Sequence, residues 1–205
     1  ESALALVLLY EVDGNKRWLE SAAKSLAFMS RQRDDRGQPP LDHWMLLATA
    51  RIWPIYDETS QPVSRQHLIR YSIDLCERLM IQAPESRSLK DKRIKGCITG
   101  NGLTCPTACR VEGLVAALDY LPEEHAAFRT RVKRVAEDSL IFLMGSQVSE
   151  GEYRGGIPYA MFRLPDDHPW QRRDYNKMAG EIRIDYVHHA ISGMMLYDDV
   201  VLRSE

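Results

Sequence analysis

Hydrophobic residues along the chain follow two kinds of helical pattern. Four short segments, which begin at Ser2, Met45, Glu112 and His189, are apolar on nearly every side and rich in small residues. Each carries an aromatic residue eight positions after its start. The longer segments between them carry a single apolar stripe, which predicts helices with one side facing solvent. The alternation therefore predicts an all-α chain of enclosed and half-exposed helices.

The pattern predicts about seven helices, as three helical hairpins and a final inner helix. Their ranges are 1–12, 16–33, 43–57, 64–82, 107–121, 123–146 and 184–202. Asp42 and Ser64 have side chains suited to capping a helix start, and Pro106 suits a first helical turn.

Two long polar segments, 84–105 and 147–181, precede the third and fourth enclosed helices. Long irregular segments inside a compact domain are uncommon unless they serve a function. We therefore expect these segments to gather at one end of the structure, beside the starts of the helices that they enter.

Composition narrows the class of protein. With 205 residues, 44% hydrophobic and 27% charged, the chain is long enough for one domain spanning 1–205. Its 27 basic and 29 acidic residues give a net charge of -2, which provides no basic excess for nucleic acid. Its longest apolar stretch is far shorter than the roughly 20 residues of a membrane span. The chain opens at Glu1 without Met, so we expect a fragment; composition sets neither the compartment, cytoplasmic or periplasmic, nor the oligomeric state.

The helix pattern resembles part of an α/α toroid, the six-hairpin barrel of N-acylglucosamine epimerase-like proteins and several glycoside hydrolase and polysaccharide lyase families. The segment Gly155-Gly156, with the later run from Glu181 to Ser192, also resembles the closing hairpin of bacterial toroid proteins. Seven helices would be an incomplete (α/α)6 barrel. The resemblance implies a binding cleft where the inner helices begin.

The densest polar cluster at such a start is Arg183, Asp185, His188 and His189. Asp185 and His189 are four residues apart, so they share one helix face within hydrogen-bonding reach. A carboxylate beside an imidazole orients the ring and raises its basicity, as a general base requires. The alternative is a capped helix start with a structural histidine.

Arg110 and Glu112 occupy the first turns of another enclosed helix. Glu112 could act as a general acid or base, with its proton affinity tuned by burial and the guanidinium. It could equally form an internal salt bridge between two hairpins. Asp42 is expected to be a cap, and His43 beside it is a weaker candidate for the site.

Aromatic side chains near the presumed cleft could stack on sugar rings, although most aromatic residues simply pack. They are Trp44, Tyr153, Tyr159, Trp170 and Tyr186. The basic residues of 87–95, including Arg87 and Lys90, could meet an anionic substrate or form a solvated loop.

The four cysteines leave the redox environment open. Cys76 lies on an apolar helix stripe and is predicted to be a buried thiol. A disulfide between Cys97 and Cys105 is one option for the loop cysteines. Because some toroid enzymes bind zinc through cysteine and histidine, Cys105, Cys109 and His188 or His189 form a minor zinc alternative to a site without metal.

The leading hypothesis is a carbohydrate-active enzyme, a glycoside hydrolase, lyase or sugar epimerase, that needs no cofactor. Glu112 and Asp185 would share acid–base work, and His188 or His189 would move a proton. Arg110 or Arg183 would hold an anionic group of a small-molecule or polysaccharide ligand, with His43, Trp44 and Tyr186 completing the binding site. The alternatives are a non-catalytic module that binds a saccharide or a protein, and a zinc-dependent toroid enzyme.

Overall fold

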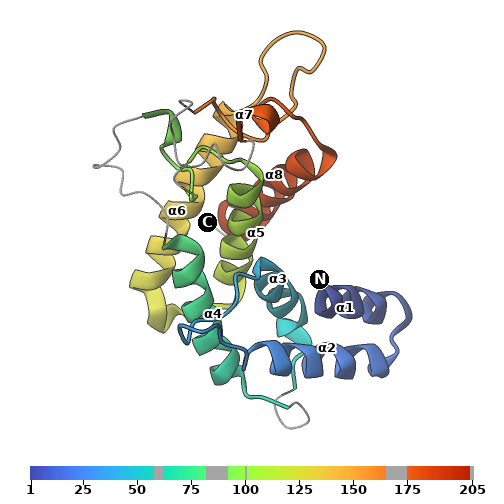
Figure 1. Ribbon diagram of the computed structural model, residues 1–205. Helices are drawn as coiled ribbons and strands as arrows, with labels where there is room; N and C mark the ends of the chain where they lie inside the picture. The colour runs from blue at the N-terminus through green and yellow to red at the C-terminus, as the bar shows by residue number, and fades with distance from the viewer. Residues whose placement is uncertain (58–61, 82–91, 100, 165–174, 204–205) are drawn as a thin grey trace. The chain divides into compact units, whose positions relative to one another are not determined.

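The structure is a computed structural model that describes residues 1–57, 62–81, 92–99, 101–164 and 175–203 (Figure 1). Within these residues all regular elements are helical and no β-strand occurs, which confirms the all-α prediction. The helices are α1 (Ser2–Asp13), α2 (Lys16–Met29), α3 (His43–Ile52), α4 (Arg65–Met80), α5 (Cys105–Tyr120), α6 (Ala126–Gly145), α7 (Tyr175–Met178) and α8 (Ile184–Tyr197). Their arrangement as part of a toroid stays a prediction.

Several helix boundaries follow from local chemistry. Gly14 ends α1 in a left-handed conformation with φ 68°, which glycine adopts without steric cost. Asp42 and Ser64 accept hydrogen bonds from the backbone amides of Trp44 and His67, which confirms both as helix caps. Pro54 lies in a 3-10 turn, Trp53–Ile55, so the helix expected over 43–57 stops early as an α-helix.

The described chain divides into two compact units. The first contains 1–81 and 113–132, and the second contains 82–112 and 133–205, so the division falls within α5 and α6. The expectation of one domain over 1–205 stays a prediction.

The first unit has a core built from the buried sides of α1 to α4 and the end of α5. Leu26, Leu46 and Leu75 are fully buried in it. Tyr120 lies at the end of α5 and donates a 2.6 Å hydrogen bond to the Ser72 hydroxyl of α4. Buried Leu, Ile and Tyr side chains therefore join helices that are distant in the sequence.

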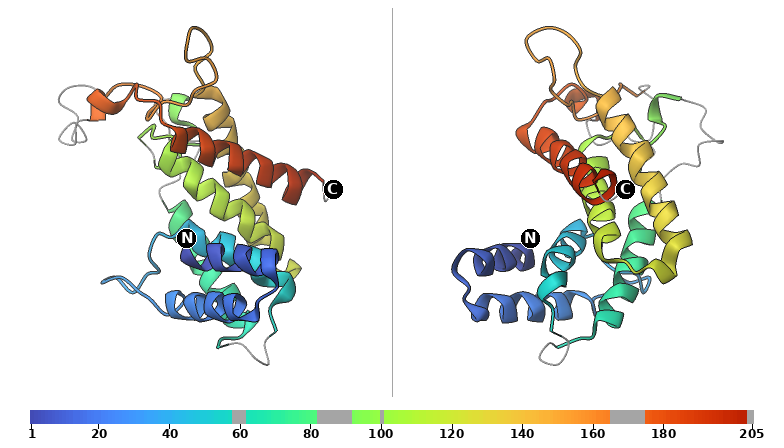
Figure 2. Two further views of the ribbon diagram at one scale, coloured as in Figure 1. Left: turned by 90° about the vertical axis from the view of Figure 1, so that its right-hand side faces the viewer. Right: turned by 180° about the vertical axis from the view of Figure 1, so that it is seen from behind.

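The second unit contains the start of α5, the end of α6, and α7 and α8. The α5 helix is enclosed as predicted: Ala108, Val111 and Leu114 are fully buried, although Leu114 already belongs to the first unit. Figure 2 shows α8 running beside the first turns of α5. Tyr197, at the end of α8, donates a 2.6 Å hydrogen bond to Glu137 of α6.

Two of the helices predicted to be enclosed expose part of their apolar surface. In α8, Ile184 and Met195 are 84% and 63% exposed. In α1, Val12 is 85% exposed, and Leu8 and Leu9 are nearly half exposed. The apolar pattern therefore predicts the burial of α5 correctly, but it overestimates how much of α1 and α8 is buried. No helix of the described residues is long and apolar enough to cross a membrane.

Candidate acid–base site

The starts of α5 and α8 are held together by a short segment of the polypeptide between them. The backbone of Tyr159 accepts a hydrogen bond from the Thr104 amide and donates one to the carbonyl of Glu181. Isolated bridges pair Leu103 with Ala160 and Pro158 with Ile182. The long segment expected to lie beside the helix starts thus fixes the first turns of α5 and α8 in one unit.

Glu112 and His189 meet across these two helices. Nδ1 of His189 donates a 2.7 Å hydrogen bond to Oε2 of Glu112. The Glu112 side chain is 2% exposed and the His189 side chain is 13% exposed, so the contact is largely shielded from water. Buried carboxylates are rare unless a charged or polar partner satisfies them, and His189 supplies that partner.

The glycine at 193 lets the two helices approach. Gly193 lies one turn after His189, and a Cβ at this position would stand 3.4 Å from Val111 and 3.7 Å from the Glu112 side chain. A larger side chain would push α8 away from α5 at the level of the pair. Gly193 was not among the predicted site residues, although a glycine in an apolar helix is a recognised sign of close packing.

The environment raises the pKa of His189 above its ordinary value of 6.5. The hydrogen bond to Glu112 is the largest cause; burial opposes it, and the charges of Glu112, Cys105 and Asp185 add to the increase. A buried carboxylate next to the ring therefore makes His189 a stronger base than a solvent-exposed histidine.

Arg183 and Asp185 form a more exposed pair at the start of α8. Nε of Arg183 donates a 3.0 Å hydrogen bond to Oδ1 of Asp185, and the guanidinium lies 5.4 Å from the centre of the Tyr186 ring. Arg183 thus binds Asp185, and the hydrogen bond to the His189 ring comes from Glu112. Asp185 contributes to the ring through its charge, which also raises the pKa of His189.

Aromatic rings follow one another beside this helix start. Tyr186 is buried, and its ring centre lies 5.9 Å from that of Tyr159, which lies 6.0 Å from that of Tyr175. The Tyr175 hydroxyl donates a hydrogen bond to the Asn101 carbonyl. These rings pack among themselves, and Tyr186 presents its face to Arg183 rather than standing alone as a stacking surface.

His188 lies beside His189 with their ring centres 4.9 Å apart, and it is exposed. Arg110 lies two residues before Glu112 on α5, a spacing at which helix side chains do not face each other. His189 contacts the Glu112 carboxylate directly, and the predicted influence of Arg110 on that carboxylate stays a prediction.

The four described cysteines are thiols. Cys76 is fully buried, as predicted, and so is Cys97. The Sγ atoms of Cys105 and Cys109 lie 4.0 Å apart on successive turns of α5, and Cys97 is paired with Thr99 rather than bridged to Cys105.

The zinc alternative stays a prediction. Cys109 and His189 bring donor atoms within 4.8 Å of each other, yet no third His, Cys, Asp or Glu among the described residues of this unit joins them at that spacing.

No family model, curated protein or solved structure matches this chain.

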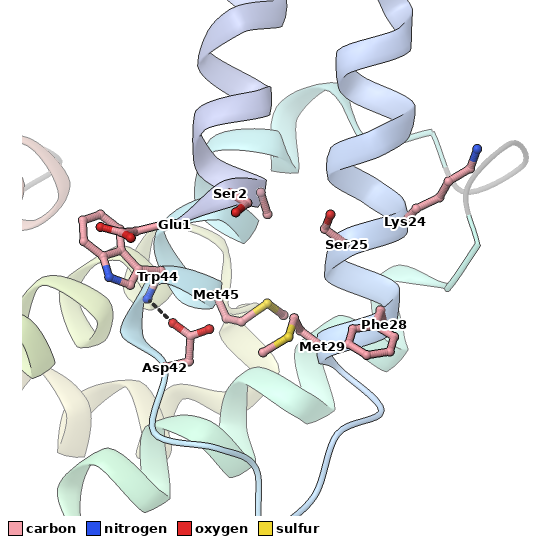
Figure 3. Close-up of a pocket in the computed structure, with 10 residues that line it drawn as sticks. Glu1, Ser2, Lys24, Ser25, Phe28, Met29, Asp42, Trp44 and Met45 are labelled. Atoms are coloured by element: carbon pink, nitrogen blue, oxygen red, sulfur yellow. Dashed lines mark hydrogen bonds between the residues drawn. The ribbon is translucent and has the colours of Figure 1, made fainter.

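Two candidate binding residues, His43 and Trp44, lie in the first unit at the start of α3. Their rings stand 4.7 Å apart. Trp44 lines a hollow of about 420 Å³ with Met45 of α3, the α3 cap Asp42, Phe28 and Met29 from α2, and the start of α1 (Figure 3). Of the remaining candidates, Arg87, Lys90 and Trp170 lie outside the described residues.

Proposed function

We propose that this chain carries an acid–base site centred on Glu112 and His189, and that it belongs to a carbohydrate-active enzyme which moves a proton to or from carbon. The observation that supports the proposal most strongly is the 2.7 Å hydrogen bond between a buried carboxylate and a histidine ring that is 13% exposed. In this arrangement Glu112 orients the ring and stabilises its protonated form, and His189 accepts the proton.

The pair favours proton abstraction next to a carbonyl over cleavage of a glycosidic bond. Hydrolysis of the usual kind needs two carboxyl groups flanking the bond, one as acid and one as base or nucleophile. Here Glu112 is engaged by His189 and Asp185 by Arg183. A sugar epimerase or a polysaccharide lyase is therefore better supported than a hydrolase.

The substrate class rests on the resemblance to toroid enzymes together with the polar helix start. Arg183 is exposed beside Asp185, so it can exchange that partner for a carboxylate or another anionic group on a ligand. A uronate or an N-acylated sugar has both the acidic C–H bond that His189 would act on and polar groups for Arg183.

Hydrogen exchange tests this proposal directly. The purified chain is incubated in D2O with N-acetylated hexosamines, free aldoses and uronate-terminated oligosaccharides, and proton NMR follows the C–H signal next to the carbonyl carbon. We expect that signal to disappear for one substrate class. His189→Asn and Glu112→Gln should slow the loss by about a hundredfold or more, because general base catalysis contributes 10²–10⁴ in rate.

Glu137→Gln is the matched control, since it also weakens a contact between α8 and another helix of the unit. It should leave the exchange unchanged. Absence of exchange with every class, or equal exchange in the His189 variant, would contradict the proposal. Saccharide binding by the wild type without any exchange, retained after both carboxylates, Glu112 and Asp185, are neutralised, would favour a non-catalytic binding module.

A further inference from the structure

The α1 helix exposes an apolar face along its whole length. The residues of this face are Ala5, Leu8, Leu9 and Val12. Their spacing of i, i+3, i+4 and i+7 places them along one side of a helix. On the opposite side, the buried residues Ala3 and Val7 pack α1 against α2 and α3 (Figure 2).

The composition of α1 indicates that this face makes a contact with another protein surface. No charged residue occurs between Ser2 and Tyr10, so no charged group interrupts the apolar face before the last turn. A helix that is apolar on nearly every side is normally enclosed, because its exposed side chains are unfavourably hydrated. Contiguous exposed apolar side chains of this kind are typical of interaction sites.

The exposed face is complementary to itself. Its four residues are arranged symmetrically about the midpoint between Leu8 and Leu9. When two copies of α1 run antiparallel about that midpoint, Leu8 of each copy lies opposite Leu9 of the other. Ala5 then lies opposite Val12, so a small side chain meets a larger one at each end. A twofold axis through the midpoint relates the two copies, as in most protein dimers.

The charges at the two ends of α1 favour the same antiparallel direction. Glu1 stands at the start of the helix, and Lys16 lies just beyond its end, after the turn at Gly14; both side chains are exposed. In an antiparallel pair, Glu1 of one copy comes to the end where Lys16 of the other copy lies. A parallel pair would bring like charges together, which disfavours that arrangement.

We propose that the exposed face of α1 binds a second copy of this chain, with the two α1 helices antiparallel in a twofold-symmetric dimer. With 12 residues, α1 is about 18 Å long. One pair of such helices buries less than the roughly 1,200–2,000 Å² of a standard stable interface, so the dimer is weak and forms reversibly. The interface contains no residue of the proposed acid–base site and does not depend on that function.

Sedimentation velocity over a range of about 10 μM to 1 mM tests the dimer, because interfaces of this size form weak complexes. The average mass of the wild type should rise from monomer towards dimer. Leu8→Asp should raise the dissociation constant at least about tenfold, because each dimer would bury two carboxylates in place of two leucine side chains.

Ile81→Asp is the matched control, since Ile81 is 69% exposed in the same unit but lies outside α1. It should leave the association unchanged, and circular dichroism checks that both variants stay helical. A wild type that stays monomeric over the whole range, or a Leu8→Asp protein that associates as the wild type does, would overturn the proposal.

Disulfide formation tests the direction of the helices. Ala5→Cys and Val12→Cys proteins are oxidised separately and as a mixture, and mass spectrometry distinguishes the new disulfides from any formed by the native cysteines. The mixture should contain a disulfide between positions 5 and 12. Links of position 5 to itself or of position 12 to itself in the separate samples would show a parallel pair, and either those links or no link in the mixture would overturn the antiparallel arrangement.

Charge reversal tests the predicted approach of Glu1 to Lys16. Glu1→Lys and Lys16→Glu should each raise the dissociation constant by about two- to fivefold, the range expected for an exposed ion pair. The protein that carries both substitutions should recover the wild-type value, because opposite charges again meet across the dimer. A double variant that associates no better than the single variants would overturn the proposed pairing.

Discussion

His189 Nδ1 lies 2.7 Å from Glu112 Oε2, although the two residues are 77 positions apart in the chain. The contact joins the second turn of α8 to the second turn of α5, where both side chains are shielded from solvent. Because a charged carboxylate in such a place needs a partner, the pair contributes to folding as well as to the proposed chemistry. Its two roles can be separated experimentally.

The pair should make stability depend on pH in one direction. Since the folded protein raises the pKa of His189 above 6.5, the protonated ring stabilises the fold. This contribution is fully present below pH 6.5 and is lost as the pH rises through the folded-state pKa. Urea unfolding should therefore show that the wild type exceeds His189→Asn in free energy of unfolding by more at pH 5.5 than at pH 9.

His188→Asn is the matched control for this stability measurement, because His188 is the exposed neighbour of His189 in the sequence. Its free energy of unfolding should follow that of the wild type across the same pH range. A difference between the wild type and His189→Asn that stays constant with pH would show that Glu112 does not stabilise the protonated ring.

Gly193 offers a test of the packing between α8 and α5. An alanine Cβ there would make ordinary van der Waals contact with Val111 at 3.4 Å. Since alanine favours helices over glycine by up to about 1 kcal/mol, Gly193→Ala should keep or raise the free energy of unfolding. Gly193→Leu should lower it by about 1–3 kcal/mol, because the added atoms overpack the interface. Equal stability of the two variants would contradict this packing.

Gly96 should respond in the opposite way to alanine. Its φ of +86° lies in the left-handed region, and an added Cβ would stand 1.9 Å from the backbone oxygen of Asp138. Backbone strain and a clash with a rigid atom act together, so Gly96→Ala should destabilise the protein by at least about 2 kcal/mol. Thermal unfolding of Gly96→Ala beside Gly193→Ala gives the comparison; an unchanged melting temperature for Gly96→Ala would contradict the close approach of Gly96 to the Asp138 backbone.

The ion pair of Arg183 and Asp185 should matter little to stability. Its side chains are 55% and 38% exposed, and ion pairs in such settings contribute about 0–1 kcal/mol. Asp185→Asn should therefore change the free energy of unfolding by less than about 1 kcal/mol in urea titrations. A larger decrease in the free energy of unfolding would show that Asp185 has a structural role in the fold.

Much of the fold could be predicted from local patterns. Hydrophobic periodicity located the main helices, and the caps Asp42 and Ser64 follow from side chains that accept backbone hydrogen bonds. Helix ends were less predictable, because packing and turns such as Trp53–Ile55 decide where a helix stops. The exposed apolar side chains of α1 and α8 were not predicted. The pattern shows which side chains are hydrophobic, but it does not show which other parts of the chain pack against them.

The contacts within the candidate site were also only partly predicted by local sequence patterns. Polar residues at the helix starts identified Glu112, Asp185 and His189, yet short-range spacing paired Asp185 with His189 and Arg110 with Glu112. The structure pairs Glu112 with His189 instead. That contact depends on how α8 packs on α5, which a rule for neighbouring residues in one helix does not contain.

The central claim is that Glu112 makes His189 a stronger base, and an NMR pH titration of the His189 ring tests it most directly. The His189 signal is assigned by its loss in His189→Asn, and His67, whose pKa burial lowers, is an internal reference. We predict a wild-type midpoint above 6.5 that falls in Glu112→Gln and falls less in Asp185→Asn, with His67 unchanged in both. A wild-type midpoint at or below 6.5, or one that Glu112→Gln leaves in place, would contradict the account.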